Sequence, residues 1–334
     1  MNQDNPAAKG PPTEPLLSVR GLVTQVSDGK RLANACDGVD LELSRGRILG
    51  LAGESGSGKS LTALSIMRLL SGPKIVAGKI LLEGRDLVPL SEREMRAIRG
   101  RRMAMVFQEP AASLDPVFTI GDQLLETLRI LRGLTGRAGR EAAIGLLESV
   151  KIPDAAGRMK DIPGKLSGGM QQRAMMALAL AGDPDLLIAD EPTTALDVTV
   201  QAGVLALIRQ IREERGMAVL MITHDFGVIA ETCDEVAVLY AGRVVETGDV
   251  ASIFADPLHP YTRGLLESVR SLESGQSGRT KPKAIPGSVP AIFDLGPGCA
   301  FRERCQVAIE ICRSIAPEQV SVGLRTVRCH RIES

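Results

Sequence analysis

The sequence predicts a mostly parallel α/β fold, with an antiparallel β layer near the N-terminus, a helical lobe in the middle and a small extension at the end. Short apolar runs end in polar residues, as parallel strands do when they present ligands at one sheet edge. Residues 16–43 alternate apolar and polar side chains, which indicates antiparallel strands with one solvated face. Residues 119–150 have helical periodicity. The apolar runs are 48–52, 103–107, 186–190 and 217–222.

Composition narrows the class of protein. Lys plus Arg and Asp plus Glu number 40 each among 334 residues, so the chain lacks the net positive charge that would favour binding of nucleic acid. The basic run 93–102 lacks interleaved aromatics, so we expect a solvated helix face there. Residues 1–10 hold no apolar core of a secretion signal, and no window approaches about 18 uninterrupted apolar residues. We therefore expect a cytoplasmic chain without a membrane span, preceded by a disordered Pro-rich leader at 1–15.

The strongest motif follows the first apolar run. Residues 53–60 read Gly-Glu-Ser-Gly-Ser-Gly-Lys-Ser and open a helical pattern that Ser71-Gly72-Pro73 would end. A strand before and a helix after favour a phosphate-binding loop over a flexible Gly-Ser turn. Lys59 would pair with the β- and γ-phosphates, and the Ser60 hydroxyl would ligate Mg²⁺. The expected nucleotide-binding residues are Gly53, Glu54, Ser55, Gly56, Ser57, Gly58, Lys59, Ser60 and Leu61.

A second glycine motif follows the predicted helical lobe. The lobe occupies about residues 109–165, after Gln108 at the end of a short apolar strand. Ser167 is a good N-cap for the alanine- and methionine-rich helix that follows it. The pair Gly168 and Gly169 at the helix start permits close approach by an anion. In isolation this pattern would only predict a capped helix.

Carboxylates and a histidine follow the last two apolar runs. Asp190 and Glu191 end one run, where Asp190 can hold Mg²⁺ and Glu191 can orient or deprotonate a water. His224 follows the other run and is a candidate γ-phosphate sensor. Alone, the acidic pair would more often be a surface turn and the histidine an ordinary surface residue. Their common position after strands favours the functional interpretation.

These ordered motifs resemble the ATP-binding cassette (ABC) transporter ATPases, a P-loop NTPase family with a RecA-like core. The resemblance covers about residues 16–256 and identifies residues 53–60 with Walker A, Gln108 with the Q-loop and residues 186–191 with Walker B. It implies catalytic roles for Glu191, His224, Lys59 and Gln108, and magnesium ligation by Ser60, Gln108 and Asp190. It also implies that Ser167, Gly168, Gly169 and Gln171 are a signature motif acting on a second cassette, and that Asp197 is the D-loop aspartate.

Further sequence segments resemble those of the ATPase subunits of dipeptide, oligopeptide and nickel importers. They are 108–110 with 113–116, residues 257–266, and a cysteine-bearing tail at 257–334. The resemblance implies ATP hydrolysis coupled to solute uptake, at the cytoplasmic face of the inner membrane. It implies two permeases, a second ATPase subunit that is usually a sister chain, and indirectly an extracytoplasmic solute-binding protein. Peptides, nickel chelates, opines and sugars all remain open as cargo.

Two features depart from the common cassette or add to it. Cassettes commonly stack adenine on an aromatic residue before Walker A, but residues 29–39 contain none, so Leu32 or Ala33 would lie there. We therefore expect ATP and GTP to compete more evenly than usual, although the general scarcity of aromatics explains the absence equally well. The tail holds Cys299, Cys305, Cys312 and Cys329, whose irregular gaps fit zinc poorly. Similar tails imply a [4Fe-4S] cluster, with buried structural thiols as the alternative.

Two other functions compete with an importer ATPase. A soluble ABC ATPase of DNA repair or translation would carry a long coiled coil or two cassettes, and this chain has neither. A regulatory adaptor that binds but does not hydrolyse ATP would be expected to lack Glu191 or His224, and both are present.

Overall fold

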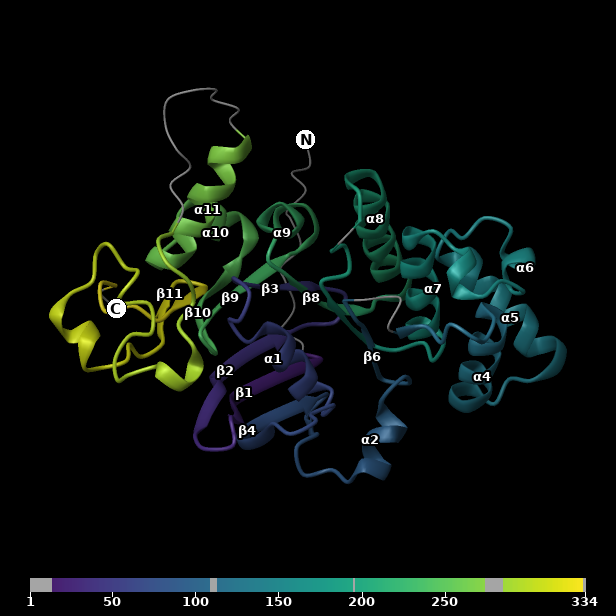
Figure 1. Cartoon of the computed structure of the whole chain (residues 1–334), viewed down its shortest axis with the longest axis horizontal. Helices are drawn as coiled ribbons and strands as arrows, with labels where there is room; N and C mark the ends of the chain where they lie inside the picture. The colour runs from purple at the N-terminus through teal and green to yellow at the C-terminus, as the bar shows by residue number, and fades with distance from the viewer. Residues whose placement is uncertain (1–13, 109–112, 195, 274–284, 333–334) are drawn as a thin grey trace, which may run out of the picture.

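The computed structural model of the chain describes residues 14–108, 113–194, 196–273 and 285–332. All but the last two residues of the expected leader, 1–15, lie outside these ranges. Two sheets form the centre of the molecule (Figure 1). The smaller sheet is antiparallel with the order β2-β1-β4-β5, as the alternating pattern predicts. Its strands are β1 (Leu17–Ser27), β2 (Leu32–Leu43), β4 (Lys74–Leu82) and β5 (Arg85–Asp86).

The larger sheet has the order β11-β12-β10-β9-β3-β8-β7-β6. Strands β9, β3, β8, β7 and β6 pair in parallel, and the other pairings are antiparallel. The four predicted apolar runs are β3 (Ile48–Ala52), β6 (Met103–Val106), β7 (Leu186–Asp190) and β8 (Ala218–Thr223). The remaining strands are β9 (Glu235–Tyr240), β10 (Arg243–Asp249), β11 (Val320–Val322) and β12 (Arg325–Val327).

Helices follow the strand ends and fill the lobe. Helix α1 (Lys59–Ile66) starts directly after the glycine loop and ends earlier than Ser71-Gly72-Pro73 predicts. The predicted helical stretch 119–150 is two helices, because Gly133 ends the first in a left-handed conformation with φ 69°. The other helices are α2 (Glu92–Ile98), α4 (Ile120–Arg132), α5 (Gly136–Ser149), α6 (Ala155–Arg158), α7 (Gly168–Leu180), α8 (Val198–Arg215), α9 (Phe226–Thr232), α10 (Val250–Ala255) and α11 (Pro260–Glu273). Short 3₁₀ turns are η1 (Pro163–Lys165), η2 (Ile292–Asp294) and η3 (Glu310–Arg313).

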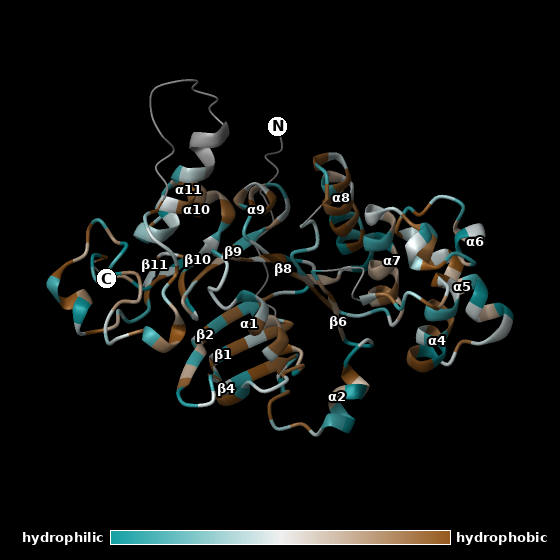
Figure 2. Cartoon of the chain, in the orientation of Figure 1, coloured by the Kyte–Doolittle hydropathy of each residue, from teal (hydrophilic) through white to brown (hydrophobic). Residues whose placement is uncertain are grey.

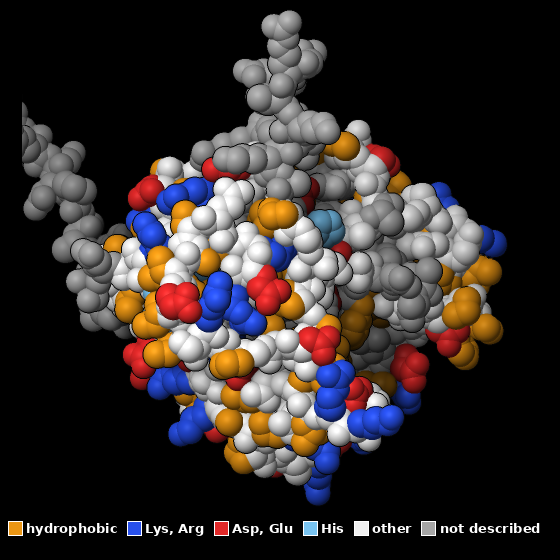
Figure 3. All heavy atoms as spheres, turned by 60° about the vertical axis from the view of Figure 1, so that its left-hand side comes forward, with side chains coloured by type: hydrophobic (Ala, Val, Ile, Leu, Met, Phe, Trp, Pro, Cys, Tyr) orange, Lys and Arg blue, Asp and Glu red, His pale blue; other side chains and the backbone are white. Residues whose placement is uncertain are grey.

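Apolar residues are concentrated in the sheets, and charged residues are spread over the surface. Apolar residues are concentrated along the strands of the large sheet and alternate with polar ones on the antiparallel sheet (Figure 2). Acidic and basic side chains are interspersed on the face shown in Figure 3, outside the atoms drawn in grey. The basic run includes the exposed Arg96, which pairs with Glu92 on α2 as a solvated helix face would. In the described part of the chain, no helix combines the length and apolarity needed to cross a bilayer.

The extension is joined to the cassette core. Strand β12 pairs with β10, so the tail lengthens the main sheet. Phe301 is 4% exposed, and its ring centroid lies 5.2 Å from Tyr240 and 5.3 Å from Tyr261. His259 is fully buried, and burial lowers its pKa to about 3, so the imidazole is neutral in the folded chain. This aromatic cluster makes the extension part of the folded cassette.

Truncation of Phe301 tests this shared core. We expect Phe301→Ala to lower the free energy of unfolding by about 3–5 kcal/mol, because a buried aromatic side chain is replaced by a cavity. Chemical denaturation measures the change. The control Leu324→Ala, at a side chain that is 99% exposed, should change stability by no more than about 0.5 kcal/mol. Equal, small losses in both variants would contradict a shared core.

Candidate active site

The predicted phosphate-binding loop packs closely against backbone from other strands. A Cβ on Gly53, whose φ is 151°, would lie 2.3 Å from the Leu239 carbonyl oxygen. Gly58 has φ 105°, and a Cβ there would lie 2.8 Å from the Ala35 carbonyl oxygen. Both positions therefore require glycine. The loop ends at Lys59, whose ammonium donates to the carbonyls of Gly53 across 2.7 Å and Glu54 across 2.9 Å. Burial lowers the pKa of Lys59, and the nearby carboxylates oppose this shift.

Two predicted magnesium ligands lie together. The Ser60 hydroxyl donates to Asp190 Oδ1 across 3.1 Å, and joins the start of α1 to the end of β7. Burial raises the pKa of Asp190, while the hydrogen bond from Ser60 acts in the opposite direction. A hydroxyl and a carboxylate, completed by phosphate oxygens and water, are the hard donors that Mg²⁺ prefers. These residues fit the ion, although the third predicted ligand, Gln108, contacts Glu191 instead of this pair.

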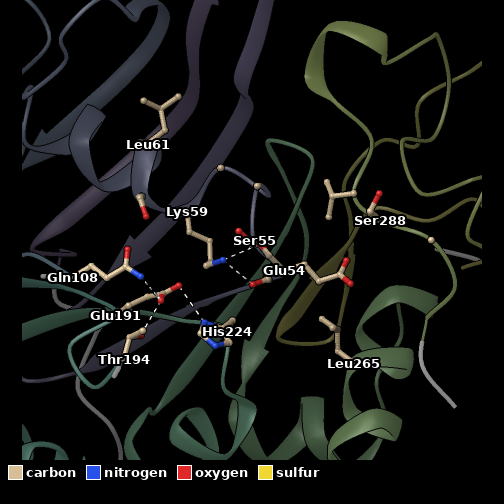
Figure 4. Close-up of a pocket in the computed structure, with 16 residues that line it drawn as sticks. Glu54, Ser55, Lys59, Leu61, Gln108, Glu191, Thr194, His224, Leu265 and Ser288 are labelled. Carbon is tan, nitrogen blue, oxygen red and sulfur yellow. Dashed lines mark hydrogen bonds and ion pairs between the residues drawn. The ribbon is translucent and has the colours of Figure 1, made fainter. Parts of the chain in front are cut away.

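Glu191 is held by three side chains. Gln108 Nε2 donates to its Oε2 across 3.0 Å, and Thr194 Oγ1 donates to the same oxygen across 2.8 Å. The other oxygen lies 3.2 Å from His224 Nδ1 (Figure 4). The backbone of Glu191 has φ 47°, a left-handed conformation that non-glycine residues adopt mainly at functional sites. Motif spacing did not identify Thr194, because this contact depends on how the chain turns after β7.

The electrostatics of Glu191 keep its carboxylate ionised. Burial alone would raise its pKa, but the hydrogen bonds with Thr194 and His224, together with the charges of His224 and Lys59, lower it. The carboxylate is therefore ionised at neutral pH. It can accept a hydrogen bond, or a proton, from a water that attacks a phosphate above Lys59.

One cavity of about 890 Å³ joins these groups. Its lining includes most of the glycine loop together with Lys59, Ser60, Leu61, Gln108, Glu191, Thr194 and His224. Leu265 of α11 and the segment 287–289 also line it. In the sequence, only the resemblance of residues 257–266 to importer ATPases pointed to this part of the chain, and it did not predict that the extension lines the cavity.

The remaining motif residues lie elsewhere. Ser167 caps α7 by accepting from the Met170 N–H across 3.4 Å, and Gly168 and Gly169 form the first turn of that helix. Gln171 donates to the Pro163 carbonyl, and Asp197 caps α8 through the Val200 N–H. None of them lines the cavity around Lys59. The sequence predicts that the signature residues act on another subunit, and this role stays a prediction.

The expected adenine contact also stays a prediction. Leu32 is 68% exposed, and neither it nor Ala33 lines the cavity. The tip of the β1–β2 hairpin contacts the extension instead, where the Arg31 guanidinium lies 5.1 Å from the Phe293 ring centroid.

The four tail thiols converge. Cys299, Cys305, Cys312 and Cys329 line one small cavity of about 20 Å³, and none is in a disulfide. Burial raises the pKa of the Cys299, Cys305 and Cys329 thiols. Within the described ranges, no group of three or more His, Cys, Asp or Glu side chains has the arrangement to hold a single metal ion. Four thiols match the number of ligands that an iron-sulfur cluster takes, and the cluster stays a prediction. Cys36 is fully buried in β2, as expected of a core thiol, and Cys233 is partly buried after α9.

Comparison with known proteins agrees with this geometry. Residues 36–194 match the ABC transporter family, and residues 245–312 match the C-terminal region of oligopeptide/dipeptide transporters. A probable peptide ABC transporter ATP-binding protein of Sinorhizobium fredii is 48% identical over 94% of this chain and 92% of its own length. A putative peptide import ATP-binding protein of Brucella melitensis is 48% identical over 96% and 98%. The ADP- and phosphate-bound cassette MJ0796 covers 70% of this chain and 98% of its own length, with TM-score 0.63 and 27% identity.

The fold and the site define an ABC-type P-loop ATPase, which binds and hydrolyses ATP with Mg²⁺. Within that class, the chain belongs to the peptide ABC transporter ATP-binding proteins, since it is similar to them along nearly its whole length.

Replacement of Glu191 tests its predicted role as the base. We expect Glu191→Gln to lower the rate of ATP hydrolysis at least about a hundredfold, because the amide cannot accept the proton. Phosphate release at saturating Mg-ATP measures this rate. Binding of ATP should persist in Glu191→Gln and be lost in Lys59→Ala. Glu213→Gln on the surface of α8 is the matched control and should hydrolyse normally. Near-normal hydrolysis by Glu191→Gln would exclude Glu191 as the base.

Proposed function

We propose that this chain drives peptide uptake as the ATP-hydrolysing subunit of an importer. The observation that supports this most strongly is the ionised Glu191, held by Gln108, Thr194 and His224 in the same cavity as Lys59. The names of its relatives support peptides as the cargo.

The residues suggest a division of labour in hydrolysis. Lys59 would hold the β- and γ-phosphates, while Ser60 and Asp190 would hold Mg²⁺, which neutralises the charge of the phosphates. Glu191 would accept a proton as the oxygen of water bonds to the γ-phosphorus and the bond to the bridging oxygen breaks. His224, 3.2 Å from Glu191, would orient that carboxylate and contact the γ-phosphate. Gln108, at the boundary of the helical lobe, would link hydrolysis of the γ-phosphate to movement of that lobe.

A second cassette would complete each site. Ser167 and Gly168 are exposed at the start of α7, where backbone N–H groups and the helix dipole are available to an anion. We infer that these residues, with Gly169 and Gln171, meet the γ-phosphate of a partner subunit while Asp197 lies at the shared boundary. The partner would be a sister subunit, although a second copy of this chain satisfies the same chemistry.

The permeases would dock beside the helical lobe. A groove of about 850 Å³ lies between the core and the lobe. Phe107 at the end of β6 and Phe118 before α4 line it and are 39% and 56% exposed. Exposed aromatic side chains in a groove next to Gln108 suit an apolar element of a membrane partner. This arrangement would hold the chain at the cytoplasmic face of the inner membrane.

A charge in that groove tests docking. We expect Phe118→Asp to reduce co-purification with the permeases at least about tenfold, because a carboxylate is costly in an apolar contact. Its affinity for Mg-ATP should not change. Ile130→Asp, at an exposed position of α4 that does not line the groove, is the matched control. Undiminished co-purification of Phe118→Asp would place the permease contact elsewhere.

The cargo needs a separate test, which is to identify the solute that the binding protein of the complex retains.

We also propose that the four tail cysteines bind a [4Fe-4S] cluster. Their convergence on one cavity supports this, and entry of the cluster would require the loops between them to move apart. Structural thiols are the alternative.

The proposed division of the chain is a leader at 1–15, a cassette at 16–256 with its helical subdomain at about 109–165, and the cysteine-bearing extension at 257–334.

Anaerobic purification tests the cluster. Protein from iron-replete cells should be brown and contain about four iron atoms per chain, because each cysteine ligates one iron. Cys305→Ser should lose both colour and iron, while Cys36→Ser, a buried thiol in β2, should keep them. Colourless, iron-free wild-type protein would favour structural thiols. Elemental analysis and visible absorption measure both properties.

The two competing functions have separate tests. An adaptor would bind Mg-ATP but never hydrolyse it, even with its permeases, whereas an importer subunit would hydrolyse it. A soluble ABC ATPase would not co-purify with permeases at all.

A further inference from the structure

The C-terminal extension contacts the phosphate-binding loop at Glu54. The Arg304 guanidinium donates to both carboxylate oxygens of Glu54, across 2.6 and 2.9 Å. The backbone N–H of Glu54 donates to the Tyr261 hydroxyl across 2.9 Å. Two distant parts of the extension therefore hold the side chain and the backbone of one loop residue.

Arg304 lies in the interior of the protein. Its side chain is 6% exposed, and the guanidinium carbon lies 5.8 Å from the Tyr240 ring centroid. A bidentate guanidinium-carboxylate pair fixes both partners in one geometry. The Arg304 side of the pair is shielded from water while the Glu54 side chain is 31% exposed, so removal of Glu54 would leave a buried guanidinium uncompensated. Glu54 is therefore tied to the extension more tightly than a surface ion pair would tie it.

The same guanidinium holds a wall of the nucleotide cavity. Arg304 Nε donates to the Pro286 carbonyl across 2.8 Å, and Nη2 lies 3.3 Å from the Gly287 carbonyl. Ser288 and Val289 come next in the chain and line the cavity. Figure 4 shows Ser288 and Leu265 on one side of Lys59, with Gln108, Glu191 and Thr194 on the other. Arg304 thus joins this wall to the loop that carries Lys59.

We propose that the extension forms part of the ATP site of its own subunit, and that Arg304 is a positioning residue that sets nucleotide affinity through Glu54. The proposal rests on the placement of ATP at Lys59. Lys59 Nζ donates to the Glu54 carbonyl across 2.9 Å, so a shift of Glu54 also moves an acceptor of this ammonium. Arg304 is not among the residues that line the cavity, so it would act on the nucleotide through the loop and the wall.

Calorimetric titration of the full chain with Mg-ATP tests Arg304. In a Glu191→Gln background, which keeps the ATP intact, we expect Arg304→Ala to raise the Kd about tenfold, as loss of a charge-assisted contact does. The double variant Glu54→Arg with Arg304→Glu restores the pair with reversed charges and should bind more tightly than either single variant. A wild-type Kd in Arg304→Ala would overturn the proposal, as would a double variant that binds no better than the single ones.

Arg302→Ala is the matched control. Arg302 lies in the same segment of the extension and donates to the Pro297 and Cys299 carbonyls, and within the described ranges it forms no hydrogen bond or ion pair with the phosphate-binding loop. Its Kd should stay within about twofold of wild type. An equal loss of affinity in Arg302→Ala would mean that ATP binding requires only that this segment of the extension is folded. It would overturn a specific role for Arg304. Lys59→Ala should not bind Mg-ATP, and normal binding by that variant would overturn the nucleotide placement itself.

A tryptophan tests the wall without disturbing Arg304. The chain contains no Trp, so Ser288→Trp introduces a single tryptophan beside the cavity, which can be excited selectively at wavelengths longer than tyrosine absorbs. We expect its emission to change on addition of Mg-ATP, with half of the total change reached at a concentration equal to the calorimetric Kd. Leu324→Trp, at the 99% exposed position of the extension, should not respond. No response from Ser288→Trp, in protein that binds Mg-ATP by calorimetry, would show that the extension does not border the nucleotide and would overturn the proposal.

Discussion

The close approach of backbone to backbone around the glycine loop constrains the rest of this structure. Gly53 lies against the Leu239 carbonyl at the end of β9, and Gly58 lies against the Ala35 carbonyl in β2. The loop therefore contacts both sheets, and it can do so only where no Cβ intervenes. Its position directs the start of α1 toward the end of β7, where Ser60 reaches Asp190. The antiparallel and parallel sheets are thus joined at the place where the anion would bind.

The catalytic end of the cavity combines strain with hydrogen bonding. Glu191 adopts a left-handed backbone conformation that costs about 1–3 kcal/mol for a non-glycine residue. Three side chains from separate segments hold its carboxylate in place. Gln108 comes from the boundary of the helical lobe and His224 from the end of β8. A rigid movement of the lobe would therefore change the environment of Glu191, which is the route that we propose from permease docking to hydrolysis.

The extension has a larger structural role than its place at the end of the chain indicates. It adds two strands to the main sheet and an aromatic cluster to the core, and it places a buried arginine against the phosphate-binding loop. Arg304, which contacts Glu54, directly precedes Cys305 in the chain, so adjacent residues of the extension belong to the thiol cluster and contact the phosphate-binding loop. A change in the position of Cys305 would therefore be expected to shift Arg304 and its contact with Glu54.

The sequence by itself determined the cassette and most of its site, because these depend on local patterns. Glycine spacing, strand periodicity and polar residues after strands led to Lys59, Ser60, Asp190, Glu191 and His224, all of which line the cavity or contact a residue that does. Only the tertiary structure decided the rest. The contact of Thr194 with Glu191 depends on a turn, the split of residues 119–150 into two helices depends on the conformation of Gly133, and the pairing of Arg304 with Glu54 joins residues 250 positions apart. Such long-range pairs leave no periodic pattern, since chain folding alone brings their partners together.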